Sequence, residues 1–385
     1  MKNYKLPSQI SFKNKPDAAR QKKNNWLRLF SLLAVLGLIT SMSACKDDDD
    51  DTSSGITPKG SKPTWGPTIA PEMQAVVEAL DSLTNSVPLT SLTPQQARMA
   101  PTPADAAMAV MKNNNIAMPI MTVDTVGLTI PVAGGSIHAR SYRPKSATGA
   151  LPGIVYYHGG GWVIATINTY NSSAQALAEK TNAVVVSVEY RKGPEFKFPT
   201  AHEDAYAAYM WVRENAAMLN INPAKIAVAG ESAGGGLAAA VCLMARDNEV
   251  TMPVHQLLVY PIANNDTNTE SYIKYADAKP LSKLLMQWFF NNYFRTPADG
   301  DTPWVSLVDV ADLHNLPPAT IINAEIDPLQ TEGQQLAAKL QLAGVPVTTK
   351  VYEGVTHEFF GMAAVVPQAA EAQELATNEL KEAFQ

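Results

Sequence analysis

Strand-like and helical stretches alternate along this chain, and this alternation restricts the fold more than any other feature. Such alternation predicts a mostly parallel sheet that is covered by helices on both faces. The first two strands have no helix between them, so we expect them to form an antiparallel hairpin at one edge. The eight expected strands are residues 126–132, 136–144, 152–158, 182–190, 225–230, 255–261, 319–327 and 347–354, and the helices between and after the later ones are 170–179, 201–219, 235–246, 281–294, 331–343 and 368–384.

The stretch GESAGG, residues 230–235, lies where a predicted strand turns into a predicted helix. Ser232 stands at this turn, with Gly230 and Gly234 at G-x-S-x-G spacing. A serine at a sharp strand-to-helix turn exposes its hydroxyl, and its neighbours must be small because backbone approaches backbone there. The same pattern also occurs in ordinary glycine-rich turns, but its position between strand and helix favours a nucleophile.

A glycine-rich loop upstream offers donors for an oxyanion. The sequence His158-Gly-Gly-Gly-Trp162 follows the strand 152–158. Backbone N–H groups of such a loop, together with the N–H of Ala233, can form an oxyanion hole. A phosphate-binding loop is the alternative, but no GK[ST] follows and the spacing does not match a dinucleotide fold.

The general base must be one of six histidines: His138, His158, His202, His255, His314 and His357. After a G-x-S-x-G nucleophile the acid and then the histidine follow in the chain, which leaves the last three. His255 opens an apolar strand and is expected to be structural. His314 lies in a connecting loop. His357 follows the last strand in a loop, where a movable imidazole is expected.

The acid that orients the base is expected at Asp327, which ends the strand 319–327 and precedes a proline. Its carboxylate would hold the imidazole and stabilise the imidazolium. Asp309 and Asp312 are alternatives, although they precede that strand. Glu325 is a further alternative because residues two apart share one face of a strand.

Together, the motifs HGGGW, GESAGG, DPLQTEG and THEFF resemble the hormone-sensitive lipase family of α/β-hydrolase esterases. The block from Val188 to Val212 and the stretch QLAGVPVTTKVYEG extend this resemblance over residues 70–385. The resemblance implies an α/β-hydrolase fold with an eight-stranded sheet and a helical cap built from residues 71–120 and 264–293. It assigns the catalytic and oxyanion roles to Ser232, Asp327 and His357, and to Gly159, Gly160 and Ala233.

Two residues beside these motifs depart from the family pattern. Glu231 replaces the commoner aspartate before the serine, and Glu358 follows the histidine where glycine is common. The Glu358 carboxylate either points inward and raises the pKa of His357 or packs outward without effect. The family often dimerises through its edge strand, here residues 347–354, so a homodimer is an expectation from the resemblance.

The N-terminal segment resembles an export signal. Residues 1–28 carry eight basic residues, and the apolar run 29–39 is too short to span a bilayer. Met42-Ser-Ala-Cys45 resembles the lipobox of bacterial lipoproteins, so we expect a signal peptide over residues 1–44 and lipid on Cys45. A membrane-anchoring helix is the alternative. Cys242, the second of two cysteines, lies in an Ala-rich stretch and is expected in the core.

The residues after Cys45 are expected to form a flexible acidic tether, 45–70, ahead of a hydrolase domain, 71–385. Asp47 to Asp51 follow Lys46 and resemble the tag of surface lipoproteins in some Gram-negative bacteria, or form a solvated charge run. We therefore expect an outer-membrane lipoprotein. Without residues 1–44 the chain has 22 basic and 35 acidic residues, and such a surface disfavours nucleic acid.

The sequence therefore predicts a serine carboxylesterase that acts on short-chain esters through an acyl-enzyme. No metal or cofactor is expected, because the chain has no HExxH motif, Cys/His cluster or EF-hand loop. A deacetylase of surface glycans or an amide hydrolase with the same triad is an alternative activity. A ligand-binding module without catalysis is an alternative of another class.

Overall fold

The computed structural model describes residues 55–385, which contain one eight-stranded sheet in the order β1-β2-β4-β3-β5-β6-β7-β8. Only the pairs β1/β2 and β2/β4 are antiparallel. The predicted fold, with an antiparallel hairpin at one edge of a mostly parallel sheet, is confirmed. The strands are β1 (Val123–Val132), β2 (Gly135–Pro144), β3 (Leu151–Tyr157), β4 (Val184–Glu189), β5 (Ile221–Glu231), β6 (Gln256–Val259), β7 (Ala319–Ile326) and β8 (Val347–Thr356).

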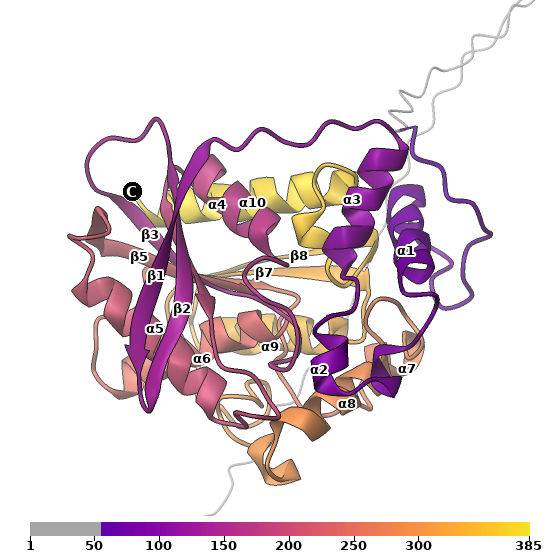
Figure 1. Ribbon diagram of the computed structural model, residues 1–385. Coiled ribbons are helices and arrows are strands. Elements are labelled where there is room, and N and C mark those ends of the chain that lie inside the picture. The colour runs from indigo at the N-terminus through magenta and orange to yellow at the C-terminus, as the bar shows by residue number, and fades with distance from the viewer. Residues whose placement is uncertain (1–54) are drawn as a thin grey trace, which may run out of the picture. The chain divides into compact units, whose positions relative to one another are not determined.

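Helices cover both faces of this sheet. Figure 1 shows α4 and α10 above the sheet and α5, α6 and α9 below it. The α-helices are α1 (Pro71–Leu83), α2 (Pro94–Ala97), α3 (Pro103–Asn113), α4 (Asn171–Thr181), α5 (Thr200–Glu214), α6 (Ala233–Asp247), α7 (Glu270–Lys274), α8 (Lys283–Tyr293), α9 (Gln330–Leu342) and α10 (Pro367–Ala383), and the short 3-10 turns are Leu89–Ser91, Pro297–Asp299 and Phe359–Gly361.

Strand β3 shows how the sheet divides the core in two. Successive side chains of a strand point to opposite faces. Val155 and Tyr157 pack with α5 and α6 in one buried cluster, whereas Ile154 and Tyr156 pack with α4 and α10 in the other. A central parallel strand is therefore apolar at every position. Cys242, in α6, is fully buried in the first cluster, as predicted.

Helix α5 is shorter than its sequence predicts. The expected helix 201–219 ends at Glu214, with Asn215 as its C-cap. The side-chain amide of Asn215 donates to the carbonyl of Trp211, and turns over residues 216–220 lead into β5 at Ile221. The apolar residues after Glu214 therefore belong to a turn that starts the next strand, which a helical periodicity does not distinguish.

The prediction of a flexible tether over residues 45–70 is wrong for residues 56–70. Residues 56–70 pack on the domain: Ile69 is fully buried, Ile56 is nearly so, and the hydroxyl of Thr68 donates to Glu325 of β7. The backbone N–H groups of Lys59 and Gly60 donate to the carboxylate of Glu78 in α1. A few apolar anchors and these hydrogen bonds order a stretch of polar composition. The expected signal peptide, Cys45 and the acidic run lie outside the described residues.

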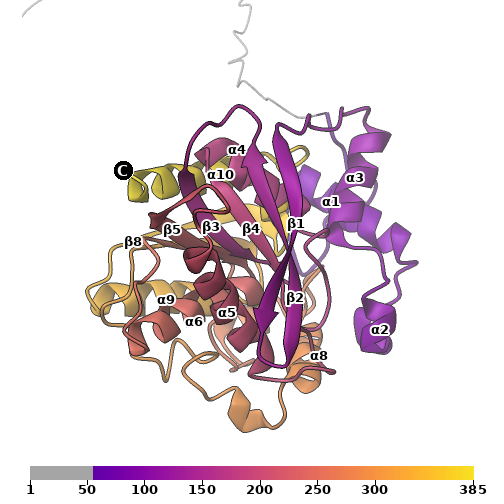
Figure 2. The ribbon, with the colours of Figure 1, turned by 60° about the vertical axis from the view of Figure 1, so that its left-hand side comes forward.

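The two segments expected to form a cap include α1, α2 and α3, and α7 and α8. Figures 1 and 2 show the first three helices grouped at one side of the sheet.

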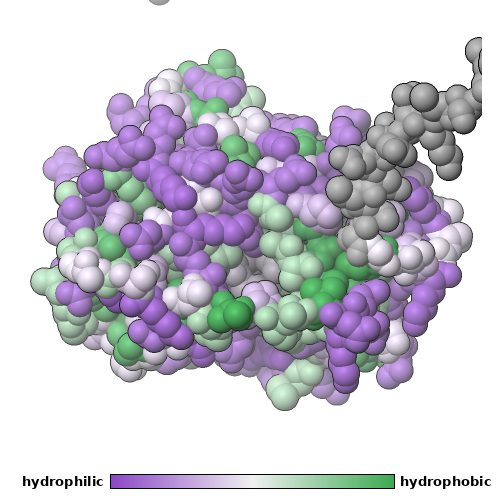
Figure 3. Space-filling view, turned by 90° about the horizontal axis from the view of Figure 1, so that it is seen from above, coloured by the Kyte–Doolittle hydropathy of each residue, from purple (hydrophilic) through white to green (hydrophobic). Residues whose placement is uncertain are grey.

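The loop from α3 to β1 carries exposed Met118, Ile120 and Met121. Figure 3 looks down on the side of the molecule along which this loop runs and shows apolar groups gathered among mostly hydrophilic ones.

Among the helices of residues 55–385, none has the length and apolar character of a membrane-spanning segment.

Candidate active site

Ser232 occupies a strained turn between β5 and α6. Its backbone has φ +57° and ψ −121°, a conformation that non-glycine residues rarely adopt. A Cβ added at Gly230 would lie 2.1 Å from the carbonyl oxygen of Gly234, and one at Gly234 would lie 2.0 Å from that of Tyr157. Only glycine fits at these two positions, so the flanking glycines are what allow the turn.

Ser232, His357 and Asp327 form one hydrogen-bonded chain. The Oγ of Ser232 lies 2.8 Å from Nε2 of His357, and Nδ1 of His357 lies 2.7 Å from Oδ2 of Asp327. The second oxygen of Asp327 accepts from the backbone N–H of Leu329 at 2.9 Å. All three side chains are nearly or fully buried. A proton on the serine hydroxyl therefore has a direct path to an imidazole whose other nitrogen is fixed.

The sheet topology explains why residues so distant in sequence meet. Ser232 follows β5, Asp327 follows β7 and His357 follows β8, and these strands run parallel. The carboxyl ends of parallel strands open at the same edge of a sheet, where side chains from several strands converge. The three residues singled out from the sequence are therefore brought together by the fold.

The alternative histidines lie elsewhere. His255 is buried, and its Nε2 lies 2.8 Å from the hydroxyl of Thr320. His314 is 67% exposed and pairs with Asp312 at 2.6 Å. Neither reaches Ser232, which supports the structural role expected of His255 and removes His314 and Asp312 from consideration.

The other alternative acids are also engaged away from the serine. Asp309 accepts a hydrogen bond from the side chain of Asn264 at 2.9 Å. Glu325 accepts from Thr68 at 2.8 Å and from the backbone of Gly354 at 2.7 Å. Glu325 therefore fastens the ordered N-terminal stretch to β8 and does not orient a histidine.

The glycine-rich loop after β3 lies beside the serine. Among the described residues, nothing accepts a hydrogen bond from the backbone N–H of Gly159, Gly160 or Ala233. Gly160 lines the same cavity as Ser232 and has φ +97°. A Cβ there would lie 2.4 Å from the carbonyl oxygen of Ile164. The loop therefore offers unused donors at the nucleophile, and its course requires glycine at residue 160.

The buried carboxyl of Glu231 and the two tyrosines that donate to it lie beside His357, and the sequence did not predict this group. Glu231 accepts hydrogen bonds from Tyr156 at 2.5 Å and from Tyr260. Burial raises the pKa of Glu231 to about 7, although the tyrosine hydrogen bonds lower it. The only signal in the sequence was the glutamate beside the serine, since the tyrosines belong to apolar strands and carry no motif.

The environment of His357 favours its protonated form. Burial by itself lowers its pKa, but the charge and hydrogen bond of Asp327 and the charges of Glu358 and Glu231 raise it, and the net pKa lies above 6.5. Glu358 takes the inward of its two expected orientations: its Oε1 lies 3.9 Å from Nε2 of His357. Burial raises the pKa of Glu358 itself.

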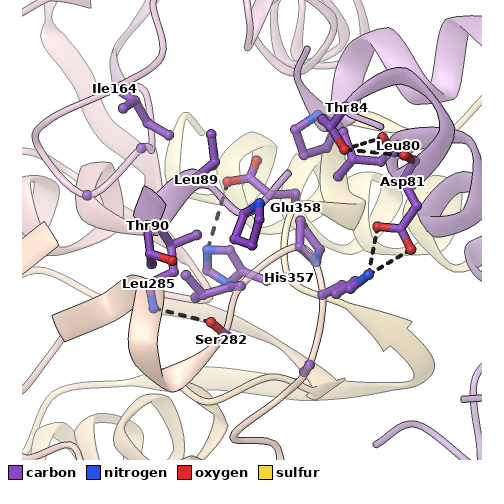
Figure 4. Close-up of a pocket in the computed structure, with 18 of the residues that line it drawn as sticks. Leu80, Asp81, Thr84, Leu89, Thr90, Ile164, Ser282, Leu285, His357 and Glu358 are labelled. Atoms are coloured by element: carbon purple, nitrogen blue, oxygen red, sulfur yellow. Dashed lines mark hydrogen bonds and ion pairs between the residues drawn. The ribbon is translucent and has the colours of Figure 1, made fainter. Parts of the chain in front are cut away.

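A cavity of about 500 Å³ opens on Ser232 and His357. It is bounded by residues of the two segments expected to form the cap, including Leu89 and Leu285, and Trp65 of the ordered N-terminal stretch also lines it. Figure 4 shows Leu89, Thr90, Leu285 and Glu358 around His357. Within residues 55–385 no group of three or more His, Cys, Asp or Glu side chains could hold a metal ion.

Comparison with known proteins agrees with this architecture. Residues 154–361 match a family model described as alpha/beta hydrolase fold. The chain is 40% identical over 267 residues to the carboxylesterase NlhH of Mycobacterium tuberculosis, covering 68% of this chain and 82% of that protein. It is 37% identical over 250 residues to the carboxylic ester hydrolase LipN of the same organism, covering 63% of this chain and 66% of that protein.

Solved structures give the same result. A hyperthermophilic esterase from the archaeon Pyrobaculum calidifontis superposes with a TM-score of 0.73 at 37% identity, covering 82% of this chain and 98% of that one. The order of the strands, the strained serine turn and these similarities all point one way. The chain belongs to the α/β-hydrolase fold family, and these relatives of it are ester hydrolases.

Proposed function

We propose that this protein is a serine carboxylesterase, with Ser232 as nucleophile, His357 as general base and Asp327 as the acid that orients the base. Ser232 attacks the ester carbonyl carbon while Nε2 of His357 takes its proton. The oxyanion that forms accepts hydrogen bonds from the backbone N–H groups of Gly159, Gly160 and Ala233. The alcohol leaves with the proton from His357, and water then hydrolyses the acyl-enzyme by the same steps.

One observation carries this proposal. The hydrogen-bonded chain from Asp327 through His357 to Ser232 ends in a cavity that also contains Gly160 of the donor loop. Nucleophile, base, orienting acid and unused donors then share one site, as acyl transfer requires. The relatives named as ester hydrolases give the bond type, and the mostly apolar cavity suits an acyl chain.

The test is hydrolysis of nitrophenyl esters from acetyl to dodecanoyl by the full-length protein. Short chains should be cleaved, and Ser232→Ala should lower kcat on the order of 10⁶-fold. Thr90→Ala is the matched control, because it also removes a hydroxyl from the cavity wall and should retain activity. A phosphonate ester should label Ser232 covalently. Full activity of Ser232→Ala would refute the assignment.

We also propose that the protein is exported and anchored through lipid on Cys45, with its site outside the cytoplasm of a Gram-negative bacterium. The support is the sequence alone, namely the basic segment, the short apolar run and the Met42-Ser-Ala-Cys45 ending. Labelled fatty acid should be incorporated into the wild-type protein and not into Cys45→Ala. Equal labelling of the two would refute the anchor.

A further inference from the structure

Glu358 places a carboxyl group beside the proton-transfer atom of the candidate site. Its side chain lines the cavity that contains Ser232, and its Oε1 lies 3.9 Å from Nε2 of His357. Figure 4 shows the two side chains next to each other. Nε2 is the atom that gives its proton to the departing alcohol oxygen. A group this close to Nε2 therefore lies near the first atoms of the alcohol half of an ester.

The fold holds this carboxyl in place despite a strained backbone. Glu358 has φ +74°, in the left-handed region that disfavours residues with a side chain. A glycine would adopt this backbone without strain. The buried hydroxyl of Tyr170 donates to Oε1 at 2.6 Å and fixes the side chain. Strain that surrounding contacts maintain at a candidate active site is a reason to look for a function of the strained residue.

The carboxyl has hydrogen-bonding capacity left. A carboxylate offers about four acceptor positions on its two oxygens. The contacts with Tyr170 and His357 both involve Oε1, and no residue in the range 55–385 donates to Oε2. Oε2 therefore keeps its acceptor positions open, on a side chain that lines the cavity where a ligand would bind.

The other charges of the cavity favour the same kind of ligand. The charged side chains that line it, besides Glu358 and His357, are Asp81, Asp277 and Lys279. Both oxygens of Asp81 accept from Lys279 at 2.7 Å, so the one lysine of the wall is already paired. The surplus of acidic groups attracts hydrogen-bond donors and cations and repels anions.

We propose that Glu358 is a specificity-determining residue that recognises the alcohol half of the substrate. It selects esters whose alcohol carries a hydrogen-bond donor, either a hydroxyl or a protonated amine, two carbons from the ester oxygen. The substrate class is then acyl esters of polyols or amino alcohols. This inference rests on the proposed esterase function, and its test is chosen so that the two can fail separately.

The experiment compares kcat/KM of the full-length protein within two pairs of acetates of equal shape. Ethylene glycol monoacetate is compared with propyl acetate, and dimethylaminoethyl acetate is compared with isoamyl acetate. Within each pair only the donor differs, so effects of a variant on general catalysis cancel in the ratio. The variants are Glu358→Gly, which suits the backbone, and Glu358→Gln, with Asp277→Asn as a control that removes another acid of the cavity.

Wild type should prefer the donor-bearing ester in each pair about tenfold, as a hydrogen bond to a charged group provides. Glu358→Gly should lose both preferences while still cleaving propyl acetate. Glu358→Gln should keep a smaller preference for the hydroxyl, because its amide oxygen still accepts but carries no charge, and lose the preference for the ammonium. Asp277→Asn should keep the preference for the hydroxyl.

Hydrolysis of nitrophenyl acetate by a variant shows that the variant is folded. It also distinguishes failure of the role of Glu358 from failure of the proposed esterase function. Ratios near one in wild type, ratios unchanged in Glu358→Gly, or cleavage of nitrophenyl acetate but of no alkyl acetate would overturn the role of Glu358 alone. If Glu358→Gly does not fold, an unchanged ammonium preference in Glu358→Gln overturns it. If wild type cleaves no ester, the proposed function fails and this inference fails with it.

Discussion

The ring of Tyr260 packs against the imidazole of His357, with 4.5 Å between the centroids, while its hydroxyl donates to the buried carboxyl of Glu231. One side chain thus touches the candidate base and the acid that precedes the candidate nucleophile. The base is therefore supported from Asp327 on its Nδ1 side and packed against a hydrogen-bonded tyrosine on its face.

Tyr260→Phe should keep the ring packing and remove one donor from Glu231. A buried acceptor that loses a partner costs about 1–3 kcal/mol of the free energy of unfolding. Urea unfolding measures this loss. Tyr272→Phe is the matched control, because Tyr272 is fully buried and its hydroxyl has no partner within residues 55–385. Equal losses in the two variants would contradict a specific role of the Tyr260 hydroxyl.

Glu231→Gln should stabilise the protein more at neutral and alkaline pH than at acid pH. Burial raises the pKa of Glu231 from 4.5 to about 7, so the unfolded chain ionises this group first as the pH rises. Wild type then loses stability between these two pH values, by about 3 kcal/mol, and the glutamine variant does not. Chemical unfolding at pH values below 4.5 and above 7 measures the difference.

Glu371→Gln provides the control for this measurement. Glu371 is exposed and pairs loosely with Lys350 at 3.6 Å, so its removal should change stability little at any pH. A stability gain of Glu231→Gln that does not vary with pH would mean that the buried charge is not the cause.

Hydrolysis should need neutral His357, so kcat/KM should rise with pH and reach half its plateau above pH 6.5. The cause is the net rise of the His357 pKa, to which Asp327 contributes most and Glu358 next. Glu358→Gln should therefore move this rise of kcat/KM to lower pH. A pH–rate profile of each protein checks this, and a rate that rises on acidification would contradict it.

Asp327→Asn should lower kcat about 10⁴-fold, and the same rate measurements check this.

Gly160→Val should reduce kcat about 10²–10³-fold, because a side chain there collides with the carbonyl of Ile164 and displaces the oxyanion donors. Gly149→Val is the control. Gly149 has φ +70°, similar backbone demands and open space around its Cβ position. Steady-state kinetics of the two variants separates backbone strain in general from damage to the donor loop. Full activity of Gly160→Val would argue against an oxyanion role for this loop.

Much of this molecule could be predicted from local sequence. The eight strands and the larger helices follow from apolar periodicity, because a strand buried on both faces is apolar throughout and a helix is apolar on one stripe. The turn at Ser232 follows from the two glycines, since any Cβ there meets backbone within about 2 Å. The candidate triad follows from the order of its members in this type of fold.

Other features depended on contacts between distant segments. The packing of residues 56–70 rests on contacts such as that of Thr68 with Glu325, and α5 ends early through a cap that periodicity does not show. The contact between His357 and Ser232 forms only in the folded sheet, which brings the carboxyl ends of β5, β7 and β8 to one edge. Burial and neighbouring charges set the pKa of Glu231 and of His357, and both are properties of the folded state.

The sequence by itself therefore determined the elements, their order and the residue types able to do chemistry, because these depend on spacing and on backbone sterics. Only the tertiary structure decided which of those residues meet, which carboxyls are buried and that Glu358 points into the cavity. Distances and solvation act through space, and residues 125 positions apart, such as Ser232 and His357, come into contact only when the whole sheet is formed.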